Sequence, residues 1–74
     1  MTSQMLCVRL IPRGEVRCFE EDEIAVSTIL ERIRDMLDES AGVIVVVNGK
    51  PVDNLHYIVK KDDEVVVAQE FMGG

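Results

Sequence analysis

The chain has 74 residues and a mass of 8.3 kDa, and 47% of its residues are hydrophobic and 30% charged. A folded chain of this size buries only about 60% of the surface that it exposes when unfolded, so we expect one small domain without an enclosed active site. Eight basic and fourteen acidic residues give a formal net charge of −6, which argues against a nucleic-acid or membrane surface and favours basic protein partners.

The apolar and cysteine content narrows the class of protein further. The longest apolar stretch, residues 41–47, is much shorter than a membrane span, and the N-terminus has no signal-peptide pattern. We therefore expect a soluble, cytoplasmic protein. Two cysteines and one histidine form neither a disulfide scaffold nor a four-ligand zinc site.

The first twenty residues have the pattern of a β-hairpin. Apolar side chains alternate over 4–11, a Pro-Arg-Gly turn interrupts them at 12–14, and the alternation resumes over 15–20. A three-residue loop sets Ile11 opposite Glu15. The core face of this hairpin is then predicted to consist of Leu6, Val8, Leu10, Val16 and Cys18.

This register separates the two cysteines. Cys18 belongs to the core, whereas Cys7 and Phe19 face each other on the opposite side of the hairpin. A register shifted by one residue would bring the two cysteines face to face and make a disulfide geometrically conceivable, but an intracellular setting disfavours that bond.

The helix signal follows an acidic segment. Thr28-Ile29-Leu30-Glu31 matches a capping box, which predicts that Thr28 begins a helix that ends near Ser40-Ala41-Gly42. The apolar stripe of this helix is Ile29, Leu30, Ile33, Met36 and Leu37. Before it, Glu20-Glu21-Asp22-Glu23 is either a solvated loop or an acidic docking patch for a basic partner.

The second half of the chain predicts further strands. Residues 43–47 are uniformly β-branched, and Asn48-Gly49 is a strong turn pair. An irregular segment begins at 51–53, residues 56–59 form a short edge strand, and residues 64–69 form the last strand.

The resulting order, ββαββ, predicts an α+β roll of the β-grasp type, with one helix packed on a four- to five-stranded mixed sheet. One helix covers only one face of a sheet, yet the strands at 43–47 and 64–69 are apolar on both faces. We therefore expect an exposed apolar patch that binds a protein partner. Its candidate residues are Met5, Cys7, Phe19, Ile44, Val46, Val66 and Ala68.

The sequence given ends in Phe71-Met72-Gly73-Gly74. Glycines have no side chains, so such a tail can enter a narrow tunnel in a partner, and its last carbonyl is open to attack. We expect one domain over 1–72 and a flexible diglycine tail at 73–74. Phe71 and Met72 either anchor this tail in a partner's groove or pack on the sheet.

With this terminus and two internal segments, the chain resembles the ubiquitin-like sulfur carriers of the ThiS and MoaD kind. The small archaeal modifiers and the ubiquitin-related modifier are close relatives of that family. The resemblance rests on a Val-Asn-Gly element within 45–52, on Asp63-Glu64-Val65 before the last strand, and on Gly73-Gly74. The family commonly has an Asp-Gly-Asp turn where this chain has Lys61-Asp62-Asp63.

The resemblance implies a carrier rather than an enzyme. A ubiquitin-activating-type enzyme would use ATP and magnesium to adenylate the Gly74 carboxylate, and sulfur from a persulfide would convert it to a thiocarboxylate. A second partner, a synthase or thiolase, would accept this sulfur in molybdopterin, thiamin or thiolated-tRNA synthesis. The chain itself would have no catalytic residue, metal or cofactor, and would be a monomer when free.

Two alternatives remain open. The same adenylate could lead to a protein modifier, joined through Gly74 to lysines of target proteins; Lys50, Lys60 and Lys61 would then be sites of self-conjugation. A ubiquitin-like docking domain would instead bind partners without covalent chemistry. His56 has no partner at metal-ligand spacing and is read as a turn or edge-strand residue.

Overall fold

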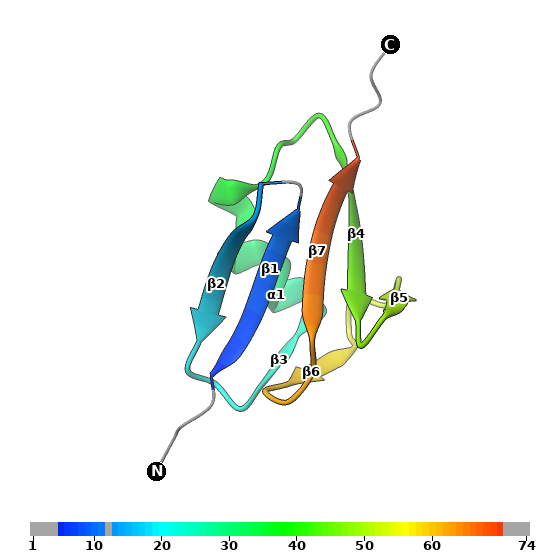
Figure 1. Cartoon of the computed structure of the whole chain (residues 1–74). Coiled ribbons are helices and arrows are strands. Elements are labelled where there is room, and N and C mark those ends of the chain that lie inside the picture. Colours follow the sequence, from blue (N-terminus) through cyan, green and yellow to red (C-terminus); the bar gives the residue numbers. More distant parts are fainter. Residues whose placement is uncertain (1–4, 12, 71–74) are drawn as a thin grey trace.

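The structure is a computed structural model that describes residues 5–11 and 13–70 (Figure 1). Its helix α1 spans Val26–Arg32 and is followed by a short 3-10 turn at Arg34–Met36. The strands are β1 Leu6–Ile11, β2 Glu15–Phe19, β3 Glu23–Ala25, β4 Gly42–Val47, β5 Lys50–Val52, β6 Ile58–Lys60 and β7 Val65–Glu70.

The fold is α+β, with one helix packed on a mixed sheet. Five strands form this sheet in the order β2-β1-β7-β4-β5; β1 and β7 run parallel and the other neighbours antiparallel. Helix α1 lies behind the sheet in Figure 1. The chain also contains two strands that the sequence did not predict: β3, which pairs with β6 in a small second sheet, and β5, which forms a hairpin with β4.

The core lies between the sheet and α1. The strands contribute to it through alternate residues, such as Val45 and Val47 in β4 and Val65 and Val67 in β7, because successive side chains of a strand point to opposite faces. The buried apolar residues are Leu6, Val8, Leu10, Phe19, Ile24, Val26, Ile29, Ile33, Val45, Val47, Val59, Val65 and Val67.

The start of the helix differs from the predicted capping box. Helix α1 begins at Val26, so Thr28 is a helical residue, and the N-cap residue Ala25 makes no side-chain cap. Two carbonyl groups of the chain before β6 replace that cap: the Val26 N–H donates to the Tyr57 carbonyl at 2.9 Å, and the Ser27 N–H donates to the Leu55 carbonyl at 2.9 Å. Tertiary contacts therefore satisfy the first helical amides.

The register of the β1–β2 hairpin is shifted by one residue from the prediction. Leu10, not Ile11, pairs with Glu15. The connecting loop is thus one residue longer, and it is closed by the Gly14 N–H, which donates to the Leu10 carbonyl at 2.7 Å with a φ of 78° at Gly14. A shift of one residue turns every side chain of β2 to the other face of the sheet.

This shift corrects three side-chain placements. Phe19 is buried opposite Leu6, with the Arg32 guanidinium 5.5 Å from the centre of its ring. Val16 and Cys18, predicted as core residues, are exposed. The aromatic ring offers more apolar surface for burial than the cysteine does, which explains why this register is favoured.

Candidate partner-binding surfaces

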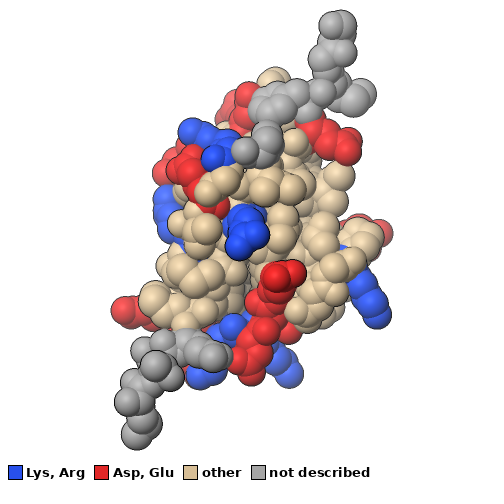
Figure 2. Space-filling view, viewed as in Figure 1, with Lys and Arg blue, Asp and Glu red and all other residues tan. Residues whose placement is uncertain are grey.

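Among residues 5–11 and 13–70, no helix covers one of the two faces of the sheet. We call this face the open face. Residues paired across neighbouring strands share a face, and the observed registers assign to it Cys7, Arg9, Ile11, Val16, Cys18, Ile44, Val46, Pro51, Val66 and Ala68. Figure 2 views the molecule from this side and shows a largely uncharged surface across the strands. The predicted apolar surface opposite the helix is thus present in the structure.

The predicted partner-binding residues separate into three groups. Ile44, Val66 and Ala68 lie on adjacent strands of the open face, where Ile44 pairs with Ala68. Ile44 is 39% exposed, and the other two are half-buried. Phe19 is a core residue, so its predicted place on this surface is wrong. Phe71, Met72, Gly73 and Gly74 lie outside the described residues.

A disulfide crosses the open face. Cys7 and Cys18 are directly opposed in β1 and β2 and are joined by a bond. The predicted register places the two cysteines on opposite faces, and the expected intracellular setting disfavours the bond; the structure differs on the first point. The one-residue shift puts both on the same face, and such bonds are typical of oxidising compartments. The disulfide joins the edge strand β2 covalently to the sheet.

The two internal segments that carry the family resemblance meet in space. The Asn48 side-chain amide donates to the Asp63 carboxylate at 2.9 Å, and the Glu64 N–H donates to the Asn48 side-chain oxygen at 2.9 Å. The Lys60 N–H also donates to Asp63. These two hydrogen bonds, with the Lys60 bond as the larger contribution, lower the pKa of Asp63 below its ordinary value of 3.8.

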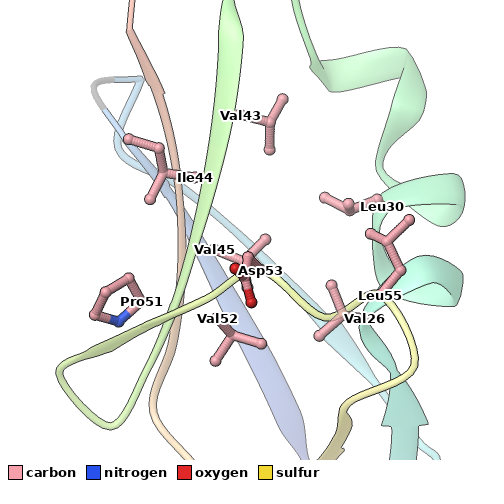
Figure 3. Close-up of a pocket in the computed structure, with 9 residues that line it drawn as sticks. All are labelled: Val26, Leu30, Val43, Ile44, Val45, Pro51, Val52, Asp53 and Leu55. Atoms are coloured by element: carbon pink, nitrogen blue, oxygen red, sulfur yellow. The ribbon is translucent and has the colours of Figure 1, made fainter.

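A groove of about 460 Å³ opens at the other edge of the sheet, between β4 and α1. In Figure 3, Val43 and Val45 of β4 point toward Leu30 of the helix, whereas Ile44 points the other way, toward the open face. The segment after β5, with Asp53 and Leu55, closes one end of the groove. The sequence does not predict this groove, because residues 51–53 have an irregular pattern and the strand β5 is not evident in it.

The acidic segment before the helix, Glu20-Glu21-Asp22-Glu23, forms salt bridges through two of its residues. Glu21 forms a salt bridge with Arg32, and Asp22 lies 3.7 Å from the Lys61 ammonium group. The same segment leads into β3. Its four acidic residues are all exposed, as a solvated loop requires, and its alternative role as a docking patch stays a prediction.

Residues 5–11 and 13–70 contain no cluster of three or more histidine, cysteine or acidic side chains arranged to hold a metal ion. Within the same ranges, no helix has the length and apolar character required to cross a membrane. In comparisons with known proteins, neither a family model nor a curated protein matches the chain.

Proposed function

We propose that this chain is a β-grasp carrier protein whose Gly74 carboxylate is adenylated by a partner enzyme and converted to a thiocarboxylate for sulfur transfer. One observation carries the proposal: the sheet has an open apolar face along β7, and β7 is the strand that leads, in the sequence, directly into Phe71-Met72-Gly73-Gly74. A partner that binds this face therefore lies close to Glu70, the last residue of β7.

The topology is compatible with this proposal. A β-grasp needs a mixed sheet in which the first and last strands run parallel at the centre and one helix covers one face. Here β1 and β7 are parallel neighbours and α1 covers one face. The hydrogen bonds between Asn48 and the Asp63-Glu64 turn further support the resemblance, because they give its two internal motifs a shared structural role.

The chemistry belongs to the partners. A carboxylate is a poor acyl donor, so an adenylating enzyme with ATP and magnesium would first form the Gly74 acyl-adenylate and release pyrophosphate. A persulfide sulfur would then attack the carbonyl carbon and displace AMP. Cleavage of the resulting S–S bond by a second thiol of the partner leaves the thiocarboxylate on Gly74 and a disulfide on the partner.

The contribution of this chain is docking. Val66 and Ala68 lie at the centre of the open face, between β1 and β4, and are half-buried by their neighbours. Arg9 pairs with Val66 and brings a positive charge to this apolar surface. A partner thus meets a largely apolar surface that carries the Arg9 guanidinium with Glu64 close by, and these charges favour a defined orientation of the partner on it.

The test is the intact mass after incubation with an adenylating enzyme of the sulfur-carrier class, MgATP and a persulfide donor. We expect the mass change for replacement of one oxygen by sulfur. A variant lacking Gly74 should not react, and Ala68→Glu, which keeps the tail, should react more slowly because a buried charge disrupts docking. An unchanged mass with enzymes proven active on their own carriers would refute the proposal.

The open face also favours a second function, a docking domain without covalent chemistry, because binding through this face does not require the tail. Deletion of Gly73 and Gly74 distinguishes the two functions. A docking domain keeps its full affinity for its partner, whereas a carrier loses all transfer. The related modifier function predicts diglycine remnants on lysines of target proteins after proteolysis.

A further inference from the structure

We propose that the groove between β4 and α1 binds an extended, basic polypeptide segment of a partner, which adds to β4 as a further strand beside β5. The groove lies at the sheet edge, and its side chains Val43, Val45 and Leu30 lie on the helix side of the sheet, although Ile44 and Pro51 at its rim belong to the open face (Figure 3). The interior of this binding site is therefore distinct from the Val66–Ala68 centre of the open face and from the tail on which the carrier proposal depends.

The backbone of β4 provides the first argument. Val47 and Lys50 flank the two-residue turn and form its closing pair, and Val46 faces Pro51, which has no N–H. Hydrogen-bonding residues alternate along an antiparallel strand, so Val47, Val45 and Val43 direct their N–H and C=O groups to this outer edge.

Strand β5 uses only part of that edge. Its pairing with β4 ends where Val45 meets Val52. In the part of the chain that the structure describes, no strand pairs with Val43 on this side, and its backbone groups lie along the groove. Such an unpaired edge accepts an additional strand through main-chain hydrogen bonds.

The side chains around this edge provide the second argument. Val43 is 41% exposed and Leu55 is 53% exposed, on opposite sides of the groove, and Leu30 lies half-buried between them. An added strand would direct every second side chain to the same side as Val43 and into contact with this apolar lining. The lining therefore fits a segment with apolar residues at alternate positions.

The charge of the groove selects among such segments. Asp53 is the charged residue of its lining, and the chain carries a net charge of −6. A lysine or arginine in the added strand would meet the Asp53 carboxylate, whereas an acidic segment would be repelled. A second copy of this chain would bring its own Asp53 and the same net charge, so a basic partner is the better match.

The probe for this site is the peptide acetyl-Ile-Lys-Val-Thr-Val-amide, with the same peptide carrying Glu in place of Lys as its control. Binding is followed by the backbone amide signals of the ¹⁵N-labelled full chain. We expect shifts at Val43, Asp53 and Leu55, and none at Arg9 or Val66 on the open face. The Glu peptide should bind several-fold more weakly.

Two pairs of variants separate the contribution of main-chain hydrogen bonding at Val43 from that of the charge at Asp53. Val43→Pro removes the outward N–H at a position where an edge strand tolerates proline, and it should weaken binding about tenfold, while Val43→Thr keeps the N–H and should bind like the parent chain. Asp53→Asn should abolish the preference for the Lys peptide over the Glu peptide. Asp62→Asn removes a charge outside the groove lining and should preserve that preference.

The peptide can also be changed instead of the protein. If Val43→Pro fails to fold, N-methylation of the central peptide residues removes their hydrogen bonds and should abolish binding to the parent chain. The proposal is refuted if the Lys peptide does not bind, if its shifts map to the open face, or if N-methylation has no effect. Self-association that Val43→Pro abolishes would instead identify a second copy as the occupant, contrary to the proposal.

Discussion

Opening the Cys7–Cys18 disulfide should destabilise the protein by a predictable amount. The two cysteines are 11 residues apart in the sequence. In the chain-entropy treatment, a cross-link around a loop of this length restricts the unfolded chain by about 2.8 kcal/mol at 25 °C. Because 1 kcal/mol corresponds to roughly 4–8 °C in a domain of this size, we expect the reduced protein to melt about 10–20 °C lower.

The assay compares thermal and urea unfolding of the oxidised protein, the protein in a thiol reductant, and the double variant Cys7→Ser/Cys18→Ser. The reduced protein and the double variant should have similar stability, since both lack the cross-link. Adding reductant to the double variant is the control and should have no effect. Alkylation followed by intact mass measurement reports whether the two thiols are free before unfolding.

Two results would contradict this reasoning. If the oxidised and reduced proteins differ by less than about 0.5 kcal/mol, the cross-link does not restrict the unfolded chain as assumed. If the protein purified without reductant reacts with the alkylating reagent at both cysteines, the disulfide does not form in it. The second result would also favour the cytoplasmic location that the sequence suggested.

Three further substitutions test the fold. Val67→Ala removes two methyl groups from a fully buried site and should cost about 2 kcal/mol in urea unfolding. Asp63→Asn leaves one acceptor oxygen for two donors, the Asn48 amide and the Lys60 N–H, and should cost about 1 kcal/mol near neutral pH. Since the folded-state pKa of Asp63 is lowered, that stabilisation is complete above pH 3.8 and is lost as the pH falls below it, so the parent chain and variant should converge in acid-unfolding curves. Gly49→Ala meets no atom within 4 Å but has a φ of 80°, so circular dichroism should show an unchanged fold with about 1 kcal/mol less stability.

The sequence predicts those strands and turns whose conformation depends on neighbouring residues alone. The β-branched run before Asn48-Gly49 forms β4, and both turn residues have the positive φ that this hairpin turn requires. The inward residues of β1 were also correctly predicted, because Leu6, Val8 and Leu10 are apolar while Arg9 must face solvent.

The predictions are wrong where contacts between residues far apart in the sequence determine the structure. Alternation in β2 is compatible with either face, and only the burial of Phe19 against the helix side selects one. The helix starts earlier than Thr28 because carbonyl groups of Leu55 and Tyr57, far along the chain, satisfy its first amides. No local motif reports such contacts. The groove beside Val43 was missed for the same reason, since it depends on where β5 stops pairing.

The central position of β7 has a consequence for biosynthesis. The strand between β1 and β4 comes last in the sheet in chain order, and its residues Val65 and Val67 complete the core. A nascent chain that has not reached this strand leaves β1 and β4 with unpaired edges and an incomplete core, and such edges are prone to aggregation. The sheet is therefore completed only after β7 has been synthesised, because β7 is its central strand and carries the middle of the open face.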